Sequence, residues 1–221
     1  APGSLSGPVT ASLDRMSGTQ YLRLNDRVEL PRLYLSWPST ALFGDHDAEL
    51  DIAADILAGG KSSRLYRALL HDREIATDVS VHQASSELSG VFSIVVTAAP
   101  GHTLSDINIV VADEIHRMQS DGVTEEELTR ARNRMEADFT WQCQSVGGFG
   151  GVSDQLNAYN VFTKTPGFFE TDWNRYKYAT PGSICEAVTM LLTPETEVAL
   201  SIVPQKADDA ALPESDLLEM R

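Results

Sequence analysis

The sequence predicts an α+β unit in which an antiparallel sheet packs against helices. Its apolar periodicity gives elements in the order β-α-α-β-β-α-α-α-α-β, which contains too few βαβ crossovers for a doubly wound parallel sheet. The 221 residues are 42% hydrophobic and 22% charged, as in ordinary globular proteins, and neither a repeat nor an internal linker divides them. A chain of this length can build a core without disulfides or a structural metal.

The first half of the chain is predicted to form one strand, two helical pieces and a strand pair. Residues 27–37 alternate between apolar and polar side chains, and Pro31 within them predicts a sheet edge or a bulge. Residues 47–58 repeat apolar side chains at helical spacing and end at two glycines, after which residues 62–70 form a second helical piece. Residues rich in β-branched and aromatic side chains then predict an antiparallel pair, over 75–84 and 91–99.

The second half is predominantly helical. Residues 104–118 have helical spacing, and residues 124–139 begin with a capping box, in which Thr124 caps the helix and Glu127 reaches back. The buried stripe of this helix is predicted to be Leu128, Ala131, Met135 and Phe139. The remaining predicted elements are a helix from 153, a helix over 180–192 with Thr180 and Pro181 at its start, and a strand over 195–204.

Both ends of the sequence have the composition of linkers. Residues 1–26 begin with a Gly/Pro/Ser-rich stretch that has neither the basic nor the apolar region of a signal peptide. Residues 205–221 are acidic and contain Pro213, which predicts a linker or tail. The expected domain is therefore 27–204, and we expect it to be part of a longer polypeptide.

The charge excludes some classes of partner. Thirty-two acidic residues against 17 basic ones give a formal charge of −15, which opposes binding to nucleic acids and to anionic membrane surfaces. No apolar run approaches the roughly 18 residues of a membrane span, so no transmembrane helix is expected.

A search for catalytic motifs predicts neither a catalytic residue nor a metal ligand in this chain. The string GGKSS at 59–63 resembles the end of a phosphate-binding loop, but Asp55 occupies the place of its first glycine and the loop follows a helix. No two of the five histidines lie three or four residues apart, and both H-E-x-x-H and H-x-x-E-H are absent. Cys143 and Cys185 lack metal-binding spacing and are expected to be free thiols, although one bridge between them stays open.

Three runs of residues resemble a known family. They are LPRLYLSWPST, HDAELDIAADILAGGKSSRLYRALLHDREIATDVSV and GVTEEELTRARNRMEADF. Together they resemble the pitrilysin/insulinase-type zinc metallopeptidases, in the second domain of a half, which is often described as the inactive peptidase domain. The resemblance covers roughly residues 27–204 and implies a metallopeptidase-like α/β roll. The segment from Val146 to Tyr176 is similar to long bacterial members in which two halves are fused.

The resemblance also implies a function. Active members enclose peptides in a chamber between two halves, and the first domain of one half holds zinc through H-x-x-E-H. That motif is absent here, so this chain is expected to form part of the chamber wall and to pack on a zinc-bearing domain, in the same polypeptide or in a partner subunit. It should hold no cofactor and should not cleave peptides alone. The sequence leaves the compartment open between the bacterial periplasm and cytoplasm, and the resemblance favours the periplasm.

Two positions depart from the family pattern. In active members the opposite half supplies an arginine and a tyrosine that hold the substrate, and the resemblance places these positions at Leu70 and Thr77, neither of which can replace them. Arg64, Tyr66 and Arg67 lie nearby but out of register, and are candidate inter-domain contacts. Either the chain belongs to the zinc-bearing half, or it is a scaffold module of a degenerate non-peptidase member. An independent hydrolase with an unrecognised site is a third alternative.

Overall fold

The computed structural model describes residues 18–148, 150–205 and 207–218. In these residues the strands are β1 (Gln20–Asp26), β2 (Arg32–Ser39), β3 (Ala76–Ser85), β4 (Gly90–Ala98), β5 (Val198–Pro204) and β6 (Asp216–Leu217). They form one sheet in the order β3-β4-β2-β5-β1-β6. The pairs β3–β4, β4–β2 and β2–β5 are antiparallel, whereas β1 runs parallel to both β5 and β6. The predicted α+β fold is confirmed, with a mixed rather than a wholly antiparallel sheet.

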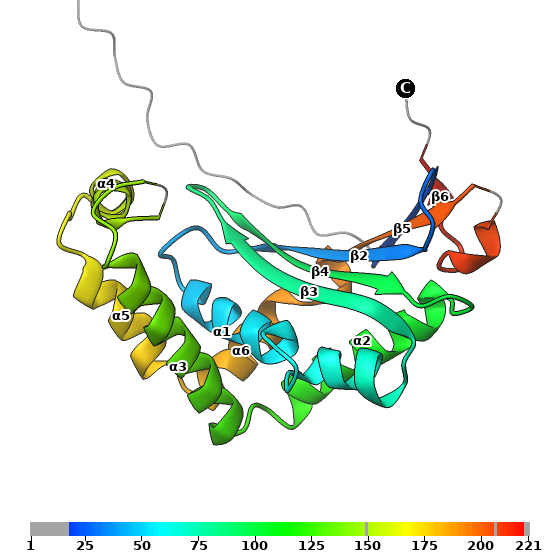
Figure 1. Ribbon diagram of the computed structural model, residues 1–221, viewed down its shortest axis with the longest axis horizontal. Coiled ribbons are helices and arrows are strands. Elements are labelled where there is room, and N and C mark those ends of the chain that lie inside the picture. Colours follow the sequence, from blue (N-terminus) through cyan, green and yellow to red (C-terminus); the bar gives the residue numbers. More distant parts are fainter. Residues whose placement is uncertain (1–17, 149, 206, 219–221) are drawn as a thin grey trace, which may run out of the picture.

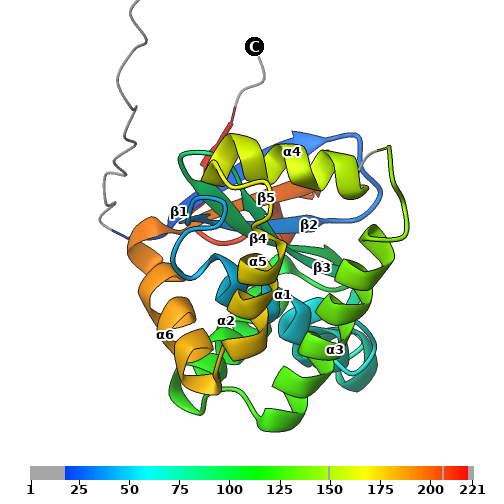
Figure 2. The ribbon, with the colours of Figure 1, turned by 90° about the vertical axis from the view of Figure 1, so that its left-hand side faces the viewer.

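Helices cover one face of this sheet. The helices of the described residues are α1 (Asp47–Ala58), the π-helix η1 (Tyr66–Asp72), α2 (Leu104–Ser120), α3 (Glu125–Gln142), α4 (Val152–Thr163), α5 (Phe169–Tyr178) and α6 (Pro181–Leu191), with 3-10 turns η2 (Pro194–Thr196) and η3 (Asp208–Ala210). Figure 1 shows α1, α2, α3, α5 and α6 below the sheet, with α4 beyond one end of it and level with the opposite face. Figure 2 shows α4 lying across that end. None of the helices in the described ranges is long and apolar enough to cross a membrane.

The core lies between the sheet and the helices because strand side chains alternate between its two faces. Along β2, Leu33, Leu35 and Trp37 are buried against the helices. They meet the apolar stripe of α1, in which Leu50 and Leu57 are fully buried. The alternation of apolar residues in the sequence therefore places the core on one side of the sheet.

The opposite face of the sheet, called the open face below, carries the other half of each strand. A row of apolar side chains crosses it, because Tyr34 of β2 pairs with Val95 of β4 and Leu200 of β5, and Leu200 pairs in turn with Leu22 of β1. All four residues are partly exposed. Among the described residues, none of the helices labelled below the sheet in Figure 1 lies over the open face, and its apolar row is partly exposed.

The predicted helix starts are confirmed in detail. Thr124 accepts from the backbone N–H of Glu127, and the Glu127 side chain accepts from the Thr124 backbone N–H, which completes the capping box. Thr180 caps α6 in the same way, with Pro181 in its first turn. In the predicted stripe of α3, Leu128 and Ala131 are buried, and Met135 and Phe139 pack partly buried against the core.

Two predicted boundaries are wrong because segments assigned to linkers pair with the sheet. Residues 20–26 form β1, whose pairing with β5 is a long-range contact that local composition does not reveal. Residues 1–17 of that predicted linker lie outside the described residues. In the predicted tail, Ala211 and Leu212 are buried, and the Leu212 N–H donates to Ser201 Oγ at 3.1 Å. β6 then pairs with β1.

One further expectation is wrong, and one helix has no counterpart among the predicted elements. Pro31 does not mark a sheet edge, because it precedes β2, which lies between β4 and β5. The helix α5 was not predicted, because the residues that it buries, Asp172 and Tyr176, are polar or amphipathic and give no aliphatic periodicity.

Candidate functional site

The positions that the sequence singled out lie along one continuous segment. Arg64, Tyr66, Arg67 and Leu70 fall on the helical segment that ends in η1, and Thr77 lies at the start of β3. Thr77 occupies a β-bulge, where the pairing with β4 skips from Ala76 to Asp78. Leu70 packs partly buried against the core and Thr77 is exposed. Neither side chain offers a charged or phenolic group at this place.

Of the three candidate inter-domain contacts, Arg64 is used within the domain. Its Nε and Nη2 donate to the two carboxylate oxygens of Glu127 at 2.7 and 2.8 Å, and Nη2 also donates to the Gly122 carbonyl at 2.9 Å. Tyr66 packs partly buried against the core, whereas Arg67 is exposed. Arg67 is therefore the most exposed of the three.

The Arg64–Glu127 pair joins the helical segment before β3 to the first turn of α3. Burial opposes ionisation of Glu127, but hydrogen bonds from Arg64 and Thr124 outweigh it and lower the pKa of Glu127 to about 2. The hydrogen bond with Glu127 raises the pKa of Arg64, against burial. The pair is therefore charged at neutral pH.

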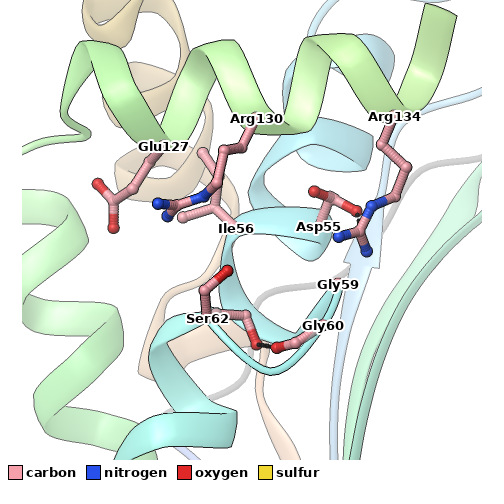
Figure 3. A pocket seen from close by; sticks show the side chains of 9 residues that line it. Asp55, Ile56, Gly59, Gly60, Ser62, Glu127, Arg130 and Arg134 are labelled. Carbon is pink, nitrogen blue, oxygen red and sulfur yellow. Dashed lines mark hydrogen bonds and ion pairs between the residues drawn. The ribbon is translucent and has the colours of Figure 1, made fainter. Parts of the chain in front are cut away.

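The GGKSS turn borders a small cavity between α1 and α3. Figure 3 shows Asp55 and Arg134 pointing toward each other across it, and their ion pair measures 3.1 Å. Burial raises the pKa of Asp55, and Arg134 opposes the shift. A Cβ on Gly59 would overlap Asp55 Oδ1, so the carboxylate lies directly against this turn. A carboxylate in that place repels phosphate, and the cavity of about 10 Å³ has room only for a water molecule.

A wider groove of about 550 Å³ adjoins this cavity, between the segment 62–72 and the helices α2 and α3. Most of its arginines are paired with carboxylates of the same surface. Arg64 pairs with Glu127, and the other two pairs are Arg117–Glu114 and Arg130–Glu126, each at 2.9 Å. The groove is therefore polar but nearly balanced in charge, and Arg67 lies on its wall.

The described residues contain no group of three His, Cys, Asp or Glu side chains that could hold a metal ion. His71 is exposed and pairs with Asp72 at 2.8 Å. Both cysteines are free, and the Cys185 thiol donates to the Gln119 carbonyl at 3.1 Å. The described residues therefore assemble no zinc site.

The sequence did not reveal a buried ionic network between α1 and α5. Arg175 on α5 bonds both to Asp172, on its own helix, and to Asp47 of α1. Tyr176, one position further, donates to Asp51 of α1 at 2.6 Å. The available signal was the i,i+4 spacing of Asp47 and Asp51 on the apolar face of a helix, where a carboxylate needs a buried partner.

Comparison with known proteins agrees with this geometry. The family model described as the peptidase M16 inactive domain matches residues 6–135. An uncharacterized zinc protease of Streptomyces coelicolor is 23% identical over 152 residues, which cover 66% of this chain and 33% of that protein. Among solved structures, a protease from Helicobacter pylori has a TM-score of 0.79 at 16% identity, over 92% of this chain and 48% of the other.

A peptidase M16 inactive domain from Pseudomonas fluorescens has the same fold, with a TM-score of 0.73 at 17% identity, and covers 90% of this chain and 47% of the other. These structures confirm the α/β architecture that the resemblance implied. The chain spans one third of the curated relative and about half of each solved structure. The family model covers more than half of the sequence, and the chain therefore belongs to the peptidase M16 inactive-domain family.

Proposed function

We propose that this domain is a non-catalytic wall of a zinc-dependent endopeptidase, which packs on a zinc-bearing domain and helps to enclose peptide substrates. Three findings support the proposal. The chain belongs to an inactive-domain family, its curated relative is named a zinc protease, and its described residues assemble no metal site. Zinc and the hydrolytic chemistry would then belong to another domain.

The open face of the sheet carries this proposal. Its row of Leu22, Leu200, Tyr34 and Val95 is partly exposed, although the opposite side of the sheet is packed against helices that include α1, α2 and α6. Apolar surface that extends across adjacent strands is typical of a face that contacts another domain or an unfolded peptide. The helix-covered face has no such need, because its apolar side chains are already buried.

The net negative charge of the domain also affects which peptides the proposed wall attracts. With a formal charge of −15, the domain attracts basic peptides at long range, and salt screens this attraction. We expect basic unfolded peptides to be captured faster than acidic ones at low ionic strength, with the difference lost at high salt.

The test is zinc-dependent cleavage by the complete polypeptide. We expect the polypeptide that includes the flanking sequence to bind zinc and to cleave a fluorogenic unfolded peptide, and the 221-residue chain to do neither. Leu200→Asp, on the open face, should reduce cleavage by the complete polypeptide. Ile109→Asp, on the exposed outer surface of α2, is the matched control and should leave it unchanged. A folded, zinc-loaded complete polypeptide that does not cleave would overturn the proposal.

A scaffold role is the second candidate. Leu70 and Thr77, at the positions that the resemblance assigns to the substrate-holding arginine and tyrosine, favour it. The two roles differ in the remainder of the polypeptide, because a scaffold member needs no H-x-x-E-H. Stoichiometric zinc in the complete polypeptide supports the peptidase role, and its absence together with absent cleavage supports the scaffold role.

A further inference from the structure

Three carboxylates and one guanidinium meet where α5 packs on α1. Arg175 Nη1 donates to Asp47 Oδ2 at 3.0 Å, and its Nε and Nη2 donate to Asp172 Oδ1 at 3.1 and 2.5 Å. The third carboxylate, Asp51, accepts a hydrogen bond from Tyr176 at 2.6 Å. This cluster therefore contains one cation for three acids, and the cation forms hydrogen bonds with two of them.

Asp47 and Asp172 have the partners that a buried carboxylate requires. Asp47 also accepts from the Phe43 N–H at 3.0 Å and from the Ser85 hydroxyl, and Asp172 accepts from the Tyr159 hydroxyl at 2.7 Å. Both acids lie in the first turn of a helix, where the helix dipole favours negative charge. Each of these two carboxylates therefore contacts the guanidinium of Arg175 and at least one further donor.

Asp51 differs from both. It lies in the second turn of α1, and Arg175 directs its hydrogen bonds to the other two acids. The other elements packed around α1 supply no compensating charge. On α3, Arg132 donates to the carbonyls of Tyr176 and Ala179, and Arg134 pairs with Asp55. The buried residues of α6 are apolar, and β3 directs Ser85 to Asp47. Asp51 is thus the acid of this cluster that gains most by keeping a proton.

The same contacts hold α5 in place. Tyr176 stacks on Trp173 and packs against Phe139 of α3, while Arg175 lies over the ring of Phe43. Asp172 in turn connects α5 to α4 through Tyr159. A change in the charge of Asp51 therefore acts on the attachment of both helices.

We propose that Asp51 is a proton-dependent latch, which holds α5, and through it α4, against α1 while its carboxyl group is protonated. Loss of the proton places a third negative charge beside Asp47 and Asp172 and weakens the docking of α5. The latch is a property of this domain alone and stands whether or not the domain lines a peptidase chamber.

The expected pH range agrees with this geometry. Burial raises the pKa of Asp51 to about 7, against the hydrogen bond from Tyr176, which lowers it, and with a further increase from Asp47. An undocked Asp51 would be solvated and would titrate at its ordinary value of 3.8. By linkage, docking weakens as pH rises between these two values and is constant above the higher one.

Hydrogen exchange of the α5 amides between pH 5 and 8, corrected for the intrinsic exchange rate, tests the latch. In the wild-type protein the opening constant of α5 should rise by up to tenfold per pH unit below pH 7 and level off above it. Asp51→Asn, which mimics the protonated acid, should abolish this rise. Asp113→Asn, an exposed position on α2, should retain it. Amides of β4 serve as the internal reference.

A second measurement keeps the proposal falsifiable if Asp51→Asn fails to fold. Carbon-13 NMR of the Asp51 carboxyl in the wild-type protein should show a midpoint near neutrality. Tyr176→Phe, which removes the donor and keeps the ring, should move that midpoint upward. A midpoint in the ordinary range of aspartate, or a pH-dependent rise that persists in Asp51→Asn, would overturn the latch.

Discussion

Arg64 forms a two-point ion pair with Glu127, and the same carboxylate closes the capping box of α3 with Thr124. The pair is 63 positions apart in sequence and each side chain is 15% exposed. Glu127 therefore fixes the start of α3 to the helical segment that precedes β3. The positions compared with the active family lie on that segment and at the beginning of that strand.

Arg64→Lys keeps the charge but loses the planar fork that meets both carboxylate oxygens. We expect it to lower the free energy of unfolding by about 1–2 kcal/mol, and Glu127→Gln, which leaves the Arg64 charge without its carboxylate, by about 2–3 kcal/mol. Urea denaturation measures both. The control is Glu126→Gln, which removes an exposed i,i+4 partner of Arg130 and should cost less than about 0.5 kcal/mol. Equal losses at positions 126 and 127 would contradict this assignment.

The Arg64–Glu127 pair also predicts that the stability of the fold depends on pH. The pKa of Glu127 is lowered from 4.5 to about 2 in the folded protein, so the pair stabilises the fold fully above pH 4.5. That contribution is lost as pH falls from 4.5 toward 2. Urea midpoints of the wild type and Glu127→Gln should therefore differ at pH 6 and converge near pH 2.5. A difference that stays constant over this range would show that Glu127 titrates normally.

Neighbouring positions on β5 should respond very differently to the same substitution. Val203 is fully buried against the helices, whereas Ile202 lies partly exposed on the open face. Val203→Asp buries an unpaired charge and should cost more than about 4 kcal/mol, enough to prevent folding in many domains. Ile202→Asp should cost only about 1 kcal/mol in the isolated chain. Circular dichroism and thermal denaturation distinguish them, and a similar loss at both positions would mean that the open face is covered.

A close backbone approach makes Gly90 sensitive to a single methyl group. A Cβ at this position would lie 2.5 Å from Ser39 Oγ, 2.7 Å from the Thr40 carbonyl oxygen and 2.9 Å from that of Ala84. Gly90→Ala should therefore destabilise the protein by about 2–3 kcal/mol through displacement of the β3–β4 hairpin. Gly167→Ala, where nothing lies within 4 Å, should change stability by less than about 0.5 kcal/mol. Thermal midpoints of the two variants provide the comparison.

The elements that could be predicted are those whose signals are local. α2 and α3 combine a long apolar period with capping boxes, α1 combines one with a glycine at its end, and the β3–β4 pair is a hairpin of β-branched residues. The elements that were missed depend on distant partners. β1 needs β5, and α5 buries Asp172 and Tyr176, which become acceptable inside the protein only through contacts with other helices.

In the candidate site, too, local signals could be predicted from the sequence, whereas long-range contacts could not. The motif pieces around Arg64 and Glu127 could be recognised separately, but their ion pair depends on the folded arrangement of η1 and α3. The pair occupies Arg64, and Arg67 is the most exposed of the three candidate inter-domain contacts, which stay predictions. Asp51 could not be singled out among 32 acidic residues until its surroundings were known.

The pairing of β1 with β5 has a consequence for how the protein is made. Thr19 and Glu197, joined by a hydrogen bond beside this pair, are 178 positions apart. A ribosome that adds roughly 5–20 residues per second would leave β1 without its partner for roughly ten seconds or more. During that time the apolar residues of β1 are exposed to other chains. β1 can therefore join the sheet only after β5 has been synthesised late in translation. We expect chaperones to bind the nascent chain through β1 before that.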